Sequence, residues 1–118
     1  MDAEGMTFHK RTKMAVIPYT SQAKGFFSKV ERSGSEGLSE GDRKVYFSDV
    51  NKKRLLRVQE LAKKYDVSVN DIALSYLMSQ PFTTIPVVGS KTVEQLKSSL
   101  KAVDVALSRD EVVYLETA

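Results

Sequence analysis

The chain has 118 residues, a formal net charge of +3 and no cysteine, and 42% of its residues are hydrophobic. This length fits one domain with a modest core, and the lack of cysteine excludes disulfides and thiolate metal sites. No apolar run is long enough for a transmembrane helix, and the N-terminus lacks the apolar core of a signal peptide. We therefore expect a cytoplasmic protein that does not interact with membranes.

The N-terminal half is predicted to contain one strand and one long loop. Residues 1–13 are polar and mixed, which indicates a lead-in segment. Residues 14–18 form a continuous apolar run, which is typical of a strand buried on both faces in a parallel sheet. Residues 28–49 are rich in Ser, Gly, Glu and Lys, and they predict a long surface loop with a short helical turn near its end.

The C-terminal half is predicted to hold four helices and a second strand. Residues 50–65 have the apolar face of an amphipathic helix, and the apolar run at residues 85–88 predicts the strand. Each of the other three helices begins with a Ser or Thr cap that is followed three residues later by Asp, Gln or Glu. These pairs are Ser68 and Asp71, Thr92 and Gln95, and Ser108 and Glu111.

Polar side chains follow both predicted strands, at the ends where α/β proteins bind ligands. After the first strand come an aromatic ring that could stack on a planar group and three hydrogen-bonding side chains. After the second come a glycine, a hydroxyl, a lysine and then a helix start, whose unpaired N–H groups and dipole favour a phosphate. An ordinary turn remains the alternative, because this is neither a Walker A nor a complete GxGxxG pattern. The residues are Tyr19, Thr20, Ser21 and Gln22, and then Gly89, Ser90 and Lys91.

Two strands joined by helices are expected to pair in parallel, but they do not form a sheet that stands alone. Each strand would leave an unpaired edge, and Pro86 removes one backbone donor from the second strand. The missing strands must therefore come from a partner chain or from a larger protein.

Residues 55–78 offer a competing interpretation, because a basic helix, a short turn and a Ser-capped helix are typical of a helix-turn-helix DNA-binding motif. The second helix has no Arg or Lys, and Asp71 near its start would repel phosphates. The sequence therefore disfavours nucleic-acid binding.

Residues 18–27 (PYTSQAKGFF) and 73–116 (ALSYLMSQPFTTIPVVGSKTVEQLKSSLKAVDVALSRDEVVYLE) resemble the C-terminal part of aldo-keto reductases. These enzymes are (β/α)8 barrels that reduce carbonyl compounds with NADPH, and both motifs occur here in the family's order. The resemblance implies an α/β fold in which residues 14–118 are a helix-rich, C-terminal fragment of a (β/α)8 TIM barrel. Residues 14–18 would be its seventh strand and residues 85–88 its eighth, and the fragment would be oligomeric or strand-exchanged.

The resemblance also implies a site for a nicotinamide dinucleotide. By position, Tyr19 matches the aromatic residue that stacks on the nicotinamide ring. Thr20, Ser21, Gln22 and Gly25 match the segment that follows the cofactor's pyrophosphate.

The other half of this implied site holds the adenosine. Gly89, Ser90 and Lys91 match the turn around the adenosine 2′-phosphate, and Gln95 and Ser99 match helix positions at the adenine end. The lysine favours NADP(H), with NAD(H) as the other possibility. The family commonly has Glu-Asn where this chain has two serines at residues 98–99, which puts the adenine contacts in question.

The family's catalytic Asp, Tyr, Lys and His lie in the first half of the barrel, and nothing in this chain corresponds to that half. We therefore expect no catalytic residue and no activity from the chain alone. One hypothesis is an NADP(H)-binding portion of an oxidoreductase that needs the missing N-terminal half. The other is a non-catalytic α/β module that self-associates to cover its strand edges. The carbonyl substrate is not predicted.

Overall fold

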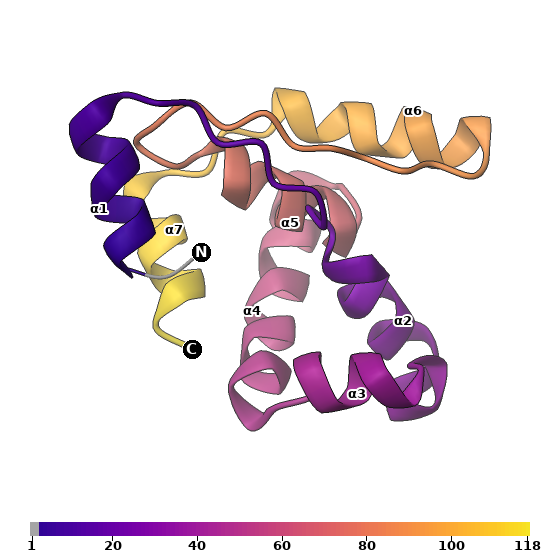
Figure 1. Cartoon of the computed structure of the whole chain (residues 1–118). Coiled ribbons are helices and arrows are strands. Elements are labelled where there is room, and N and C mark those ends of the chain that lie inside the picture. Colours follow the sequence, from indigo (N-terminus) through magenta and orange to yellow (C-terminus); the bar gives the residue numbers. More distant parts are fainter. Residues whose placement is uncertain (1–2) are drawn as a thin grey trace.

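The computed structural model describes residues 3–118, and helices account for most of it (Figure 1). Short 3-10 turns lie at Ala23–Gly25, Gly34–Gly37 and Ala102–Asp104. The α-helices of this part of the chain are α1 (Ala3–Thr12), α2 (Phe26–Ser33), α3 (Glu40–Tyr46), α4 (Asp49–Tyr65), α5 (Val69–Met78), α6 (Val93–Lys101) and α7 (Arg109–Glu116).

The two predicted strands are extended segments that run side by side but form no regular strand within residues 3–118 (Figure 1). A single parallel bridge joins Val16 to Thr84. Around it, the Val16 N–H donates to the Thr83 carbonyl (2.9 Å), and the Ile85 N–H donates to the Val16 carbonyl (2.8 Å). The predicted parallel direction is confirmed. The two predicted strands are wrong, because two prolines and the lack of a third segment stop the ladder of backbone hydrogen bonds.

These two segments, residues 14–18 and 83–88, are called the extended pair below. Exposure alternates along it with the period of a strand: Ile17, Ile85 and Val87 are exposed, whereas Val16 and Thr84 are half-buried. One face of the extended pair is thus partly covered by the rest of the chain, and the opposite face is apolar and uncovered.

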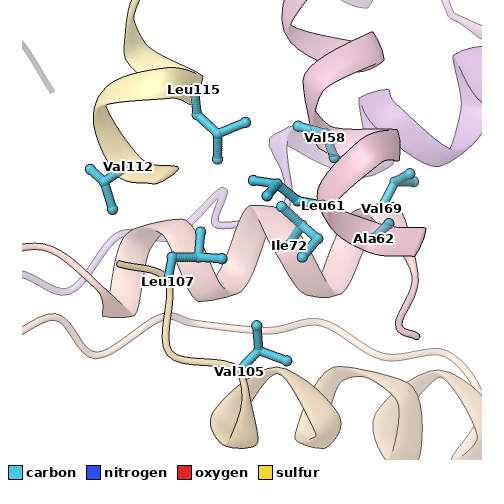
Figure 2. Packing of buried hydrophobic residues seen from close by; sticks show 9 residues of the cluster. All are labelled: Val58, Leu61, Ala62, Val69, Ile72, Val105, Leu107, Val112 and Leu115. Carbon is cyan, nitrogen blue, oxygen red and sulfur yellow. The ribbon is translucent and has the colours of Figure 1, made fainter. Parts of the chain in front are cut away.

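The hydrophobic core lies between α4, α5, α7 and the connection that precedes α7 (Figure 2). The predicted apolar face of α4 is buried at Leu55, Val58 and Ala62, and Val112 and Leu115 of α7 pack inward as predicted. Ile72 and Val112 are completely buried. The cluster consists of Val58, Leu61, Ala62, Val69, Ile72, Val105, Leu107, Val112 and Leu115.

The predicted caps are present. Ser68 and Ser108 both form complete capping boxes, at the starts of α5 and α7. Thr92 also caps α6, because its hydroxyl accepts a hydrogen bond from the Gln95 N–H (3.2 Å). Gln95 does not complete the box, since its side-chain oxygen accepts from the Lys91 N–H instead (2.8 Å).

The predicted long loop at residues 28–49 is wrong, because most of that range is helical in α2 and α3. Phe26 and Leu38 are buried, and Ser39 caps α3 by accepting from the Asp42 N–H (3.1 Å). Burial of two large side chains stabilises helices that the Ser/Gly-rich composition does not predict.

The predicted lead-in at residues 1–13 is described from residue 3, and most of its described part forms α1. Here His9 connects the helix to the rest of the chain. Its ring lies 5.8 Å from that of Phe82, and its Nδ1 is 2.8 Å from the Met14 carbonyl oxygen.

A buried carboxylate fixes α6 against α5. Asp71 is 1% exposed, and it accepts a hydrogen bond from the Ser68 N–H (2.9 Å) and another from the Ser98 hydroxyl (3.2 Å). The Ser75 hydroxyl also donates to the Ala102 carbonyl at the end of α6 (3.1 Å). The polar face of α6 is therefore held toward α5.

We expect Asp71→Ala to lower the free energy of unfolding by about 1–3 kcal/mol, because it removes a capping-box partner and leaves buried donors unpaired. Ser98→Ala should lower it by about 1 kcal/mol, because only one hydrogen bond is lost. Urea unfolding followed by circular dichroism measures both, with the exposed Asp104→Ala as the control. Equal stability of Asp71→Ala and Asp104→Ala would contradict this role.

A second carboxylate connects α7 to α4. Glu111 accepts hydrogen bonds from Lys64 (2.7 Å), from the Tyr65 hydroxyl (2.8 Å) and from the Ser108 N–H (2.8 Å). Burial raises the pKa of the Glu111 carboxyl, but the hydrogen bonds from Lys64, Ser108 and Tyr65 outweigh burial and lower this pKa to about 2.

The Glu111 contacts predict how stability depends on pH. A carboxyl group with a lower pKa in the folded chain stabilises it above the unfolded pKa, which is about 4.5 for Glu. This contribution is lost as the pH falls from about 5 toward 2. Unfolding measured at a series of pH values should show the loss in the native sequence and a flatter profile in Glu111→Gln. If the free energy of unfolding depended on pH equally in both proteins, other carboxyl groups would be responsible for the loss of stability at low pH.

Candidate functional site

All ten residues that the sequence predicts for a dinucleotide site border one cavity of about 680 Å³. The cavity lies beyond the carboxyl ends of the extended pair, and α2, α5 and α6 also contribute to its walls. The ten residues are Tyr19, Thr20, Ser21, Gln22, Gly25, Gly89, Ser90, Lys91, Gln95 and Ser99.

The first wall is a tight turn with a left-handed backbone. Ala23, Lys24 and Gly25 have φ angles of 46°, 54° and 74°, in the region that glycine tolerates best. The two non-glycine residues each cost on the order of 1 kcal/mol in such a conformation. The turn directs the chain into α2, which starts beside the cavity and has no side-chain cap.

Ser21 holds this turn to the second extended segment. Its hydroxyl is 2.8 Å from the Pro18 carbonyl oxygen and 2.9 Å from that of Val87, and the residue is buried. The single hydroxyl proton is thus shared between two carbonyl groups, which leaves none for a phosphate. The side chain of Ser21 positions the wall of the cavity.

Two further predicted residues contact each other across the cavity. The side-chain amide of Gln22 donates to the hydroxyl of Ser99 on α6 (3.2 Å). This contact joins the turn after the first extended segment to the helix after the second. Tyr19 also borders the cavity, and it is 83% exposed.

The second wall is the turn from the extended pair into α6. Gly89, Ser90 and Lys91 are exposed, and no side chain lies within 4 Å of the place where a Gly89 Cβ would stand. Gln95 accepts from the Lys91 N–H and so orders the turn. The Lys91 side chain forms no ion pair within the described part of the chain.

Sequence reasoning missed the basic side chains of the α2 wall. Lys24, Lys29 and Arg32 all border the cavity, and Asp42 neutralises part of their charge through contacts of 3.3 Å to Lys24 and 4.0 Å to Lys29. The spacing of Lys29 and Arg32, three residues apart on one helix face, could have revealed them. This spacing was not used in the prediction, because residues 28–49 are predicted to be a loop, which has no helix face.

Three helix starts point to the same cavity. Gly25 precedes α2, Ser68 and Asn70 lie at the start of α5, and Lys91 precedes α6, and all four border the cavity. The start of α2, which has no side-chain cap, adds partial positive charge to that of the basic side chains, whereas the Asp71 carboxylate opposes it at the start of α5. The cavity is therefore suited to an extended ligand that carries several negative charges.

The described residues contain no group of three His, Asp or Glu side chains that could hold a metal ion. None of their helices is long and apolar enough to cross a membrane.

Comparisons with known proteins agree on one family. The model of the aldo/keto reductase family matches residues 3–118. A Schizosaccharomyces pombe protein named "Putative aryl-alcohol dehydrogenase" is 33% identical over 98% of this chain and 33% of its own length. A norsolorinic acid reductase of Emericella nidulans is 30% identical over 87% of this chain and 26% of its own length.

A solved structure supports the fold. A thermostable aldo-keto reductase crystallised with the inhibitor epalrestat matches 95% of this chain and 32% of its own chain, with a TM-score of 0.64 and 20% sequence identity. The chain thus spans between about a quarter and a third of the length of these relatives, and its fold is a helix-rich fragment of a (β/α)8 barrel. From the family match over residues 3–118, we conclude that the chain belongs to the aldo/keto reductase family.

Proposed function

We propose that the cavity binds a nicotinamide dinucleotide, with NADP(H) preferred over NAD(H). The observation that carries this proposal is the convergence of the ten predicted residues, from segments about 70 positions apart, around one basic cavity. The site fits the chemistry of the ligand, because it combines an exposed aromatic ring at one end with hydroxyls, cations and helix starts elsewhere.

In this proposal each wall has its own task. The Tyr19 ring stacks on the nicotinamide, and the positive end of the α2 dipole attracts the pyrophosphate. The N–H groups of Gly25 and Phe26 already donate to carbonyl groups of the turn, so they order it and do not bind the phosphate themselves. Lys29 and Arg32 add positive charge beside it.

The α6 wall holds the adenosine half. Ser90 and Lys91 bind the 2′-phosphate, which NAD(H) lacks, and this is the reason for preferring NADP(H). Gln95 and Ser99 border the adenine. Two serines at residues 98–99 in place of the family's Glu-Asn make these contacts shorter and weaker.

The bound nicotinamide would supply a hydride for carbonyl reduction, and this reduction also requires a proton donor. Three of the described tyrosines are poorly suited to this role. Burial raises the pKa of Tyr76 to about 12, and hydrogen bonds to carboxylates raise the pKa of Tyr65 and of Tyr114. None of these three borders the cavity. We therefore propose that carbonyl reduction requires the further barrel segments that the longer relatives have.

The alternative is a non-catalytic module that self-associates. The uncovered apolar face of the extended pair favours it, because exposed apolar surface of this kind normally lies in an interface.

Titration with NADPH, followed by its fluorescence, tests cofactor binding. We expect saturable binding that is weaker for NADH and at least about tenfold weaker for NADPH in Lys91→Ala, because one charge-assisted contact to phosphate is lost. Lys63→Ala is the matched control, since Lys63 is exposed on α4 and lies outside the cavity. Absence of saturable binding at millimolar cofactor would overturn the proposal.

A complementation experiment tests the requirement for the rest of the barrel. The chain would be mixed with a polypeptide that comprises the first two thirds of the S. pombe relative, and NADPH oxidation would be followed with aromatic aldehydes. This substrate class is chosen from that relative's name. We expect turnover in the mixture and none from either part. Turnover by the chain alone would show that it contains its own proton donor.

A further inference from the structure

A carboxylate outside the cavity holds two of the lysines that border it. Lys24 and Lys29 both border the cavity, whereas Asp42 of α3 does not. The Asp42 carboxylate lies 3.3 Å from the Lys24 Nζ and 4.0 Å from the Lys29 Nζ. Both ammonium groups therefore face a carboxylate that lies outside the cavity.

The two lysines differ from the other cations of the cavity in having this partner. Lys91 and Arg32 also border the cavity, and they form no ion pair within residues 3–118. The side chain of Asp42 is only 13% exposed, whereas that of Lys24 is 60% exposed and that of Lys29 is 35% exposed. The carboxylate is thus largely enclosed, while the lysines stay accessible to a ligand.

The Asp42 carboxyl group is ionised at neutral pH. A hydrogen bond from the Ser39 side chain and the charges of Lys24 and Lys29 lower its pKa, and together they outweigh the burial that raises it. The ion pairs with the two lysines are therefore formed under the conditions in which a phosphate would bind.

The Asp42 carboxylate is held in place by α3. The Ser39 hydroxyl accepts a hydrogen bond from the Asp42 N–H (3.1 Å). At the two ends of this segment, Leu38 is buried and the Tyr46 ring lies 6.0 Å from that of Phe26. A lysine, in contrast, carries its charge on a flexible aliphatic chain. An anion in the cavity can therefore draw the ammonium groups toward itself, and the carboxylate stays behind.

Both lysines are placed to reach the turn that leads into α2. Lys24 belongs to this turn, and the Lys29 Cε lies 3.8 Å from the place where a Gly25 Cβ would stand. The two ammonium groups can thus contact either Asp42 or a phosphate beside the turn.

We propose that Asp42 is an internal competitor that sets the affinity of the cavity for phosphate groups. Lys24 and Lys29 leave Asp42 when they bind the pyrophosphate of the dinucleotide, so that two ion pairs are broken as the ligand binds. This inference rests on the proposed function, because it concerns the same cavity. Asp42 is a positioning residue, since it acts through the two lysines and does not border the cavity itself.

Titration of Asp42→Asn with NADPH tests the competition. We expect this variant to bind about two- to fivefold more tightly than the native sequence, because partly exposed ion pairs contribute little free energy. The difference should shrink as the salt concentration rises, since salt screens exposed charges. Glu36→Gln is the matched control: Glu36 is exposed on the same segment and forms no ion pair within the described residues. Equal affinities of the native sequence and Asp42→Asn would overturn the proposal.

The direction of the change separates competition from a structural role. If the ion pairs only ordered the lysines for the ligand, Asp42→Asn would bind NADPH more weakly, and this result would also overturn the proposal. Asp42→Glu keeps the negative charge and should retain the native affinity. Circular dichroism checks that every variant is folded.

Inorganic pyrophosphate is a probe that does not depend on the recognition of nicotinamide or adenosine. Isothermal titration calorimetry with pyrophosphate should show the same tightening in Asp42→Asn as the titration with NADPH. If NADPH failed to bind while pyrophosphate showed this tightening, the proposed function would be wrong and the role of Asp42 would stand. If NADPH bound equally to both proteins, the role of Asp42 would be wrong and the proposed function would stand. Absence of the difference with both ligands would overturn the role of Asp42.

Discussion

The parallel contact between the two extended segments determines where everything else in the candidate site lies. It consists of few backbone hydrogen bonds, yet it aligns the two segments so that Tyr19 and Gly89 leave them at the same end. If the register shifted by one residue, the apolar side chains of one segment would turn to the opposite face. Ser21 strengthens the register, because its hydroxyl contacts a carbonyl group of each segment. Through these two contacts, Ser21 positions the turn that follows the first extended segment.

Much of the helical structure could be predicted from local signals. Ser68, Ser108 and Thr92 cap the predicted helices, because a cap needs only its own side chain and an N–H three residues later. The parallel direction of the extended pair could also be predicted, since the helices between the segments leave room for no short hairpin. The ten predicted site residues lie together for the same reason.

The failed predictions concern features that depend on distant parts of the chain. The burial of Phe26 and Leu38 stabilises the helices at residues 26–46, and the Ser/Gly-rich composition hides this, although Ser39 with Asp42 is a local sign of the start of α3. The predicted strands fail for the opposite reason: the residues are suited to strands, but two strands alone are only marginally stable and the prolines remove backbone donors. As a consequence, the basic residues of α2 were missed although their spacing is regular.

The two sides of α6 show how one helix can have two roles. Its Gln95 and Ser99 side borders the cavity, its Ser98 contacts Asp71, and its apolar side is uncovered. Within the described residues nothing covers this apolar side, whose side chains are 48–68% exposed (Val93, Leu96, Leu100 and Val103). The hydrogen bonds that keep the cavity side of α6 in place are thus the ones that keep its apolar side available.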